Sequence, residues 1–264
     1  MPHRPEHKLS KPDCRAELKS GFPNVIWQYW ETRGQKPKYI DGLYEIAKKN
    51  SGVEIVLVVP ETLPGYLPDM PDYVHQIEEV AHKADMIRAM LVCKYGGMWL
   101  DSDAIVLKNL QPFFQFLDNA DFVGFNDGGK LSPNIKINCF LARAGCAIMS
   151  EWVHAQHAKF PRTKFRWLEV GTALLGPICV RHKKSVKVLP AETVCPIPWN
   201  KFDQFYSREL DATKIIDSAH IVMLQNNTML VKRSPLLGMT VEEIAGENYL
   251  ISKIVRSAIG AKVS

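Results

Sequence analysis

The chain has 264 residues, of which 46% are hydrophobic, and its formal net charge is +5. Because single α/β domains commonly run to about 200–250 residues, this length and composition favour one domain with a buried core. The weak positive charge is compatible with an anionic substrate or a membrane surface. It is too small for the basic footprint of a nucleic-acid-binding protein, so we expect no nucleic-acid partner.

The cysteines and the lack of long apolar runs bear on the location and organisation of the chain. Six cysteines are scattered without a CxxC pair and mostly among apolar neighbours, so we expect buried free thiols and a reducing, cytoplasmic compartment. Residues 1–20 lack the apolar core of a signal peptide, and no apolar run reaches the roughly 18 residues that span a membrane. We therefore expect a polar extension over residues 1–20, one main domain over 21–248 and a terminal helix over 249–264.

Strand-like and helix-like segments alternate along the chain, which is typical of a largely parallel or mixed sheet covered by helices. Short apolar or β-branched runs predict strands, and segments with a 3.6-residue apolar period predict helices. In chain order, we expect a strand at Val25–Tyr29, a helix at Ile40–Lys49, a strand at Val53–Val59, helices at Tyr73–Glu79 and His82–Tyr95, strands at Met98–Leu100, Phe122–Phe125 and Cys139–Ala142, a helix at Ile148–Lys159, and strands at Val186–Leu189 and Ala219–Leu224.

The helix at His82–Tyr95 combines a buried face with two charged residues. Met86 and Met90 recur at the helical period, with further apolar residues beside them, and predict the face that packs in the core. Asp85 and Arg88 lie three residues apart, so both side chains project from one face of the helix toward the same place.

Two aspartates one residue apart, Asp101 and Asp103, follow a Tyr-Gly-Gly turn and the short strand at Met98–Leu100. In an extended segment their side chains point the same way, with Ser102 opposite, so both carboxylates can face one ion. A divalent metal that carries a nucleotide diphosphate prefers such oxygen ligands, and α/β sheets place ligands at the carboxyl ends of their strands. These residues predict a sugar-nucleotide site, whereas the alternative is a surface turn.

The run from Lys83 to Asp103 resembles the DXD signature of the sugar transferases of capsular-polysaccharide synthesis and of the related glycosyltransferase family 32. Residues 23–30, with the sequence Pro-Asn-Val-Ile-Trp-Gln-Tyr-Trp and followed by Gly34 and Pro37, resemble the first strand and nucleotide-binding loop of that group. The resemblance implies a GT-A-like fold, a single Rossmann-type α/β domain with a mixed central sheet flanked by helices. It also implies that the domain binds a nucleotide sugar together with Mn²⁺ or Mg²⁺.

Carried over to this chain, the resemblance implies a donor site made of Trp27, Gln28, Asp85, Arg88 and Asp101. Trp27 would lie against the nucleotide base, while Asp85 and Arg88 would hold sugar hydroxyls and the diphosphate region. These roles suit an aromatic face, a carboxylate and a guanidinium fork. The alternative for Trp27 is a core aromatic residue in a buried strand.

The resemblance also implies catalytic and metal-binding residues. Asp101 and Asp103 would hold the metal, and His220 would be a third ligand, although no Trp follows it as in related enzymes. The alternative for His220 is a hydrogen-bonded structural histidine. Asn138 resembles an Asn that contacts donor or acceptor and is our further catalytic candidate, with a capping or turn role as the alternative.

Glu169 and Gly171 lie in a stretch that resembles the acceptor-side loop of the same family. Glu169 would orient an acceptor, and Gly171 would let a substrate approach the backbone closely. A solvent-facing glutamate is the alternative for Glu169.

Residues 249–262 combine apolar residues at helical spacing with basic residues and contain no acidic residue. This pattern predicts a basic amphipathic helix that can lie on an anionic membrane, where lipid-linked acceptors reside. The alternative is a terminal helix that closes the core of the domain.

Together these features predict a metal-dependent glycosyltransferase that moves a hexose from a UDP- or GDP-sugar donor to a saccharide or lipid-linked saccharide in surface-glycan or capsule synthesis. The resemblance implies retention of the anomeric configuration. Two other classes stay open. A haloacid-dehalogenase-like phosphatase would use Asp101 as its nucleophile after an apolar strand, and a non-catalytic carbohydrate-binding module would bind without turnover.

Overall fold

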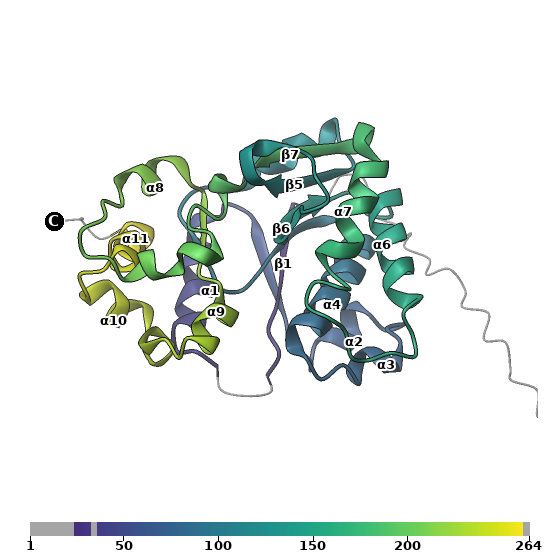
Figure 1. Ribbon diagram of the computed structural model, residues 1–264, viewed down its shortest axis with the longest axis horizontal. Coiled ribbons are helices and arrows are strands. Elements are labelled where there is room, and N and C mark those ends of the chain that lie inside the picture. Colours follow the sequence, from purple (N-terminus) through teal and green to yellow (C-terminus); the bar gives the residue numbers. More distant parts are fainter. Residues whose placement is uncertain (1–23, 33–35, 261–264) are drawn as a thin grey trace, which may run out of the picture.

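The computed structural model describes residues 24–32 and 36–260 and has a mixed α/β architecture (Figure 1). The strands of its main sheet are β1 (Val25–Tyr29), β2 (Glu54–Val58), β3 (Gly97–Leu100), β5 (Phe122–Asn126), β6 (Lys136–Ala142) and β7 (Val186–Pro190). They lie in the order β2-β1-β3-β6-β5-β7. β6 runs antiparallel to β3 and β5, whereas the other neighbours are parallel. The predicted mixed sheet flanked by helices is confirmed, and the predicted extension over residues 1–20 lies outside the described residues.

All the α-helices except α5 form two groups, which lie to the right and to the left of β1 in Figure 1. The first group contains α2 (Leu63–Tyr66), α3 (Asp72–His75), α4 (Val80–Tyr95), α6 (Ala147–His157) and α7 (Thr172–Arg181). The second contains α1 (Tyr39–Asn50), α8 (Thr213–Ser218), α9 (Asn226–Val231), α10 (Val241–Gly246) and α11 (Leu250–Ile259). The short α5 (Gln111–Phe114) packs its two phenylalanines with residues of β3, β5 and β6. Each group of helices therefore covers a separate part of the core.

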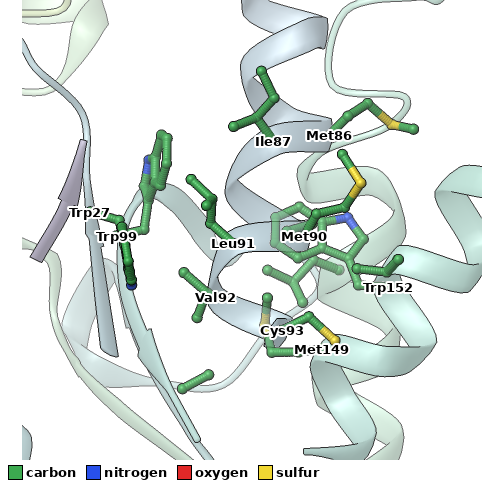
Figure 2. Close-up of a cluster of buried hydrophobic side chains, with 14 of the residues drawn as sticks. Trp27, Met86, Ile87, Met90, Leu91, Val92, Cys93, Trp99, Met149 and Trp152 are labelled. Carbon is green, nitrogen blue, oxygen red and sulfur yellow. The ribbon is translucent and has the colours of Figure 1, made fainter. Parts of the chain in front are cut away.

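Helix α4 is the central helix of the first group because apolar residues surround almost its whole length. Figure 2 shows Leu91 and Val92 on the side of Trp99, and Met90 near Trp152 of α6. All five side chains are buried, the least so being Met90 at 8% exposure. A helix that is buried on more than one side is held rigidly, so the charged residues on α4 are carried by a fixed scaffold.

The structure differs from the predicted elements in two places near the site. A strand that the sequence did not predict, β4 (Ala104–Val106), follows Asp103 directly and pairs antiparallel with β8 (Ile221–Met223) in a second, two-stranded sheet. β8 lies more than a hundred residues after β4 in the sequence, so no local pattern predicts that the two strands pair. The predicted helix at Tyr73–Glu79 is only the single turn of α3, since Glu79 is extended and caps α4 instead.

The terminal helix is α11, and its apolar face packs into the core. The buried residues of this helix are Leu250, Ile251, Ser252, Ile254, Val255 and Ala258. They join the cluster that also contains Tyr39 and Leu43 of α1. The structure therefore favours the core-closing alternative, and the predicted use of this face on a membrane is wrong because the face is not accessible. None of the helices between residues 24 and 260 that the structure describes has the length and apolar character needed to cross a bilayer.

Candidate active site

Asp101 and Asp103 lie at the carboxyl edge of the sheet, where β1 and β3 end side by side. Ser102, between them, is buried and donates a hydrogen bond from its hydroxyl to the carbonyl of Tyr29 at 3.0 Å. This bond ties the segment after β3 to the end of β1. Ser102 is thus directed to the end of β1, whereas Asp101 contacts Arg88 and Asp103 contacts Asn226.

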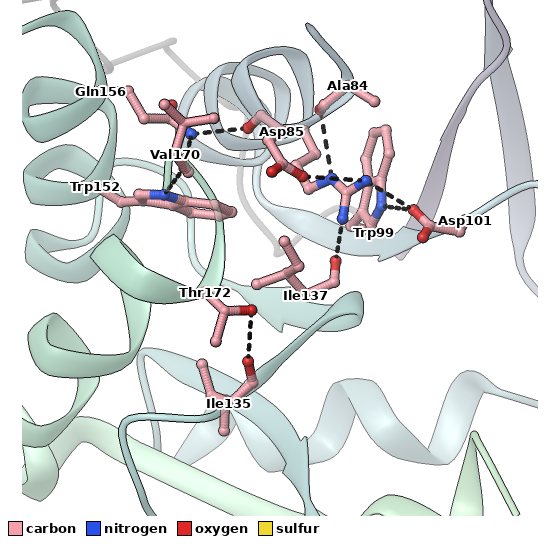
Figure 3. A network of polar contacts seen from close by, with 11 residues as sticks. Ala84, Asp85, Trp99, Asp101, Ile135, Ile137, Trp152, Gln156, Val170 and Thr172 are labelled. Atoms are coloured by element: carbon pink, nitrogen blue, oxygen red, sulfur yellow. Dashed lines mark hydrogen bonds and ion pairs between the residues drawn. The ribbon is translucent and has the colours of Figure 1, made fainter. Parts of the chain in front are cut away.

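Arg88 lies between the carboxylates of Asp85 and Asp101, both of which are labelled in Figure 3. Its guanidinium lies 3.1 Å from Oδ1 of Asp101 and 3.5 Å from Oδ1 of Asp85, and it donates to the carbonyl of Ile137 at 2.7 Å. The guanidinium also lies over the ring of Trp99, at 5.0 Å from the centroid. The structure thus brings together three of the predicted site residues, with Arg88 as the cation between two carboxylates.

The carboxyl groups of the site favour a bound cation. Burial raises the pKa of Asp85 to about 6, with Arg88 acting in the opposite direction and the Asp101 carboxylate adding a smaller rise. Burial and the Asp101 carboxylate together raise the pKa of Asp103 to about 6. Burial also raises the pKa of Asp101, although Arg88 and the indole N–H of Trp99 act in the opposite direction. A divalent ion would favour the ionised forms and so offset the cost of burying them.

The two aspartates fit Mn²⁺ or Mg²⁺ that is shared with a diphosphate. Among the residues that the structure describes, no group of three or more His, Cys, Asp and Glu side chains is arranged to hold an ion. Two carboxylates are nevertheless enough for Mg²⁺, which commonly keeps several waters and takes further ligands from substrate phosphates. Asp101 and Asp103 lie close enough for their charges to interact. The donor set therefore suits a metal that binds together with a nucleotide.

The predicted third ligand, His220, lies away from the two aspartates. In the β4–β8 ladder, the carbonyl of Asp103 accepts from the N–H of Leu224, while the carbonyl of His220 accepts from the N–H of Leu107. Asp103 and His220 are therefore at opposite ends of the ladder, more than about 10 Å apart at about 3.3 Å per residue. His220 packs against the ring of Phe113 instead, at 5.0 Å between centroids. The prediction that His220 completes the metal site is wrong.

Asn226, and not His220, contacts Asp103 in the structure, and Tyr39 contacts Asn226. The backbone N–H of Asn226 donates to Oδ2 of Asp103 at 2.5 Å, and the hydroxyl of Tyr39 donates to Oδ1 of Asn226 at 2.7 Å. Gln225, just before, adopts the left-handed conformation with φ of 58° and turns the chain from β8 into α9. These residues are far apart in the sequence, and no local signal identifies them.

Trp27 and Gln28 lie inside the core and not at the site. Trp27 is 5% exposed, donates its indole N–H to the carbonyl of Gly96 at 2.8 Å and packs against Tyr66 and Tyr95. The prediction that Trp27 lies against the base is wrong, and the core alternative holds. Gln28 is 1% exposed, and its Oε1 has no hydrogen-bond partner in the described part of the chain. Neither side chain is open to a donor.

Asn138 lies next to Asp101, as a site residue would. Its carbonyl accepts from the N–H of Asp101 at 2.9 Å, across the β3–β6 pair. Its side-chain Oδ1 is buried and has no hydrogen-bond partner among residues 24–32 and 36–260. An unsatisfied buried acceptor is costly, so this oxygen is left without the compensation that most buried polar groups find.

Glu169 and Gly171 contact other residues of the protein and not an open acceptor site. Glu169 accepts hydrogen bonds from Arg162 at 2.7 and 3.1 Å and from the N–H of Arg166 at 2.9 Å, and these bonds lower its pKa to about 2. Both of its oxygens are engaged, so it does not orient an acceptor, and that prediction is wrong. A Cβ on Gly171 would lie 2.6 Å from Oδ2 of Asp85. The close approach that the glycine allows is therefore that of the loop to Asp85.

The comparison with protein families matches residues 4–160 to the family described as capsular polysaccharide synthesis protein. Among curated proteins, lactosylceramide 4-alpha-galactosyltransferase of Rattus norvegicus is 28% identical over 130 residues, which cover 47% of this chain and 34% of the relative. Inositol phosphoceramide mannosyltransferase 3 of Schizosaccharomyces pombe is 26% identical over 105 residues, which cover 37% and 28%. The chain spans about a third of the length of the curated relatives that it matches.

Two solved structures are similar at low identity. A glycosyltransferase involved in the glycosylation of the major capsid of PBCV-1 has a TM-score of 0.46 and 14% identity, with 82% of this chain and 100% of that chain covered. The galactosyltransferase LgtC, in complex with donor and acceptor sugar analogs, has a TM-score of 0.42 and 10% identity, with 91% and 97% covered.

Proposed function

Because the chain belongs to the capsular polysaccharide synthesis protein family, we propose that it is a glycosyltransferase of polysaccharide or glycolipid synthesis. In our proposal it transfers a hexose from a UDP- or GDP-sugar to a saccharide hydroxyl, with retention of configuration and with Mn²⁺ or Mg²⁺ as cofactor. The observation that carries the proposal is the charged group at the carboxyl edge of the sheet, in which the buried Asp85 and Arg88 lie beside the partly exposed Asp101 and Asp103.

The proposed roles follow from the contacts of each side chain. Asp101 and Asp103 would hold the metal, which when bound neutralises the negative charge that develops on the departing diphosphate. Arg88 holds Asp101 at 3.1 Å and opposes the rise in its pKa that burial causes, which favours the ionised form. Asp85, on the other side of Arg88, is as buried as Trp27, so it would hold the guanidinium of Arg88 in place beneath the donor site.

The site suits a transfer that depends on positioning. A retaining transfer without a covalent intermediate needs charge stabilisation and orientation more than a strong protein base, because the departing phosphate takes the proton of the acceptor. The unsatisfied Oδ1 of Asn138 would orient a hydroxyl beside Asp101. For the nucleotide base we propose Trp30 in place of Trp27, since Trp30 follows β1 at this edge and is only partly buried.

The acceptor that we propose is a lipid-linked saccharide. The names of the curated relatives specify lactosylceramide and inositol phosphoceramide as the molecules that they glycosylate. Both are saccharide or inositol headgroups on a lipid. The mildly basic net charge of the chain is compatible with work at an anionic membrane surface.

Donor hydrolysis tests the proposal without knowledge of the acceptor. The protein is incubated with UDP- and GDP-hexoses, with Mn²⁺ or with EDTA, and release of the nucleotide is measured. We expect metal-dependent release from one donor, and a loss of at least about 100-fold in Asp103→Asn. Asp127→Asn is the matched control, because Asp127 has a side chain that is 84% exposed. Absence of release from every donor, or equal release by Asp103→Asn, would contradict the proposal.

A further inference from the structure

The segment between α6 and α7 has an unusual composition for a surface loop. Residues 159–169 read Lys-Phe-Pro-Arg-Thr-Lys-Phe-Arg-Trp-Leu-Glu, with four basic residues and one acidic residue. Three of its large apolar side chains are exposed: Phe160 at 50%, Trp167 at 59% and Leu168 at 44%. Figure 1 shows the segment at the edge of the molecule, where it passes α3 and returns to α7. Basic and apolar side chains are therefore presented together on one outer loop, which we call the basic-aromatic loop.

The basic-aromatic loop is held in its shape from inside. Its single acidic residue, Glu169, binds the side chains of Lys159 and Arg162 and the backbone of Arg166. Leu168 has a φ of 67°, and its carbonyl accepts from two N–H groups at the start of α7. A non-glycine residue in this conformation is kept there only by surrounding contacts. The loop therefore has a defined conformation, and this conformation keeps the apolar side chains exposed.

The charges of the loop leave an excess of positive charge at the surface. The carboxylate of Glu169 is engaged by the internal contacts, whereas the side chain of Lys164 is 84% exposed and pairs with Glu78 at 3.9 Å. Glu78 is itself 81% exposed, so this pair is weak. Arg166 is exposed as well, beside Trp167. Exposed Trp and Phe next to Lys and Arg match the headgroup region of an anionic bilayer, where aromatic rings and basic groups both find partners.

We propose that the basic-aromatic loop docks the protein on an anionic lipid bilayer. Trp167, Leu168 and Phe160 enter the headgroup region, and Lys164 and Arg166 contact lipid phosphates. A soluble, neutral saccharide is a less suitable ligand because it gains no electrostatic attraction from the basic side chains around the aromatic ones, whereas an anionic bilayer does. Docking on a bilayer requires neither a donor nor an acceptor, so it is a property separate from the proposed transferase reaction.

The position of the loop connects docking to the candidate active site. Two residues after its end, Gly171 lies against Asp85. Near its end, the ring of Trp167 lies 6.2 Å from the ring of His82, one turn before Asp85 on the same helix. If the proposed function is correct, docking through this loop would bring the headgroup of a lipid-linked acceptor to the edge of the sheet where the aspartates lie.

Vesicle sedimentation tests the docking separately from activity. The full chain is mixed with vesicles of phosphatidylcholine and phosphatidylglycerol, with pure phosphatidylcholine as the neutral control. We expect binding only to the anionic vesicles, weakened by salt, and a partition coefficient lowered about 10-fold in Trp167→Ser and about 30-fold in Lys164→Glu with Arg166→Glu. The matched controls are Phe116→Ser and the double change Lys183→Glu with Lys184→Glu, which alter exposed residues elsewhere and should bind as the wild type does.

The result that overturns the proposal is equally direct. Wild-type protein that stays in solution with anionic vesicles, or loop variants that sediment as fully as the wild type, would exclude the loop as a docking surface. Loss of binding to lactose in Trp167→Ser, with vesicle binding unchanged, would assign Trp167 to a saccharide site instead. Because vesicle binding needs no donor, failure of the docking and failure of the transferase reaction are seen in different assays.

Discussion

Replacement of Arg88 by methionine would leave the buried carboxylate of Asp85 and the partly exposed carboxylate of Asp101 without the cation that lies between them. Arg88 is 6% exposed and contacts both Asp85, at 3.5 Å, and Asp101, at 3.1 Å. Methionine keeps the apolar stem of the side chain over Trp99 but has no donor for the carbonyl of Ile137, which accepts at 2.7 Å in the native protein. The substitution therefore removes the charge and its hydrogen bonds with little loss of packing.

The expected magnitude follows from the burial of the partners. Removal of one member of a buried ion pair typically costs about 3–5 kcal/mol, because the other charge stays buried without compensation. We expect a loss of this size in the free energy of unfolding of Arg88→Met at pH 7.5. The matched control is Arg181→Met, whose side chain is 56% exposed and pairs with Glu151 at the surface. There we expect a loss below about 1 kcal/mol.

The pH dependence gives a second check on the same reasoning. The pKa of Asp85 is already raised to about 6 in the native protein by burial, and removal of Arg88 raises it further. The folded state then binds protons that the unfolded state releases, so stability falls as the pH rises from about 4 to 7. The deficit of Arg88→Met, measured by urea unfolding, should therefore be smaller at pH 5 than at pH 7.5. A loss below about 1 kcal/mol at pH 7.5, or an equal loss at both pH values, would refute the assignment of Arg88 as a buried counter-ion.

Three further outcomes are expected. Stabilisation of the wild-type protein by Mn²⁺, measured as a shift in Tm, should grow between pH 5 and pH 7, because Asp103, with a pKa raised to about 6 by burial, must lose its proton to bind the ion; an equal shift at both pH values would contradict this. Tyr39→Phe should weaken binding of Mn²⁺ with UDP by about 10-fold in electron paramagnetic resonance titrations, because Asn226 loses the group that orients it at Asp103, and unchanged affinity would remove Tyr39 from the site. Gly171→Ala should lower the free energy of unfolding by about 1–3 kcal/mol, since its Cβ would lie within 2.6 Å of the Asp85 carboxylate, whereas Gly65→Ala, with nothing within 4 Å, should have little effect in the same urea titration.

The sequence was a good guide where the physical cause is local. Helix α4 was predicted because its apolar residues recur at the helical period, and the spacing of Asp85 and Arg88 was enough to put both on one face. In the structure both side chains meet beside Asp101. The turn with two glycines and the short strand before Asp101 likewise located the aspartates at the edge of the sheet.

The errors arose where a residue's surroundings come from distant parts of the chain. Trp27 reads as either a ligand-facing or a core aromatic residue, and only the packing of Tyr66 and Tyr95 against it decides for the core. From the sequence alone, Glu169 is predicted to be an exposed carboxylate. In the structure, the loop folds so that Arg162 and Lys159 bind it. In each case the residue type alone leaves its role open, and the role depends on which residues the fold places beside it.

By itself, the amino-acid sequence determined the mixed α/β class, the rigid helix that carries Asp85 and Arg88, and the position of Asp101 and Asp103 after an apolar strand. These follow from periodicity and from residue spacing within a few turns of chain, for which the geometry is fixed by the backbone. Only the tertiary structure decided that Asn226, and not His220, reaches Asp103. That choice depends on the register of β4 against β8, two strands that are distant in the sequence. Ile105 of β4 and Val222 of β8 are buried in the hydrophobic cluster that α1 and α11 also form, so this register depends on tertiary packing.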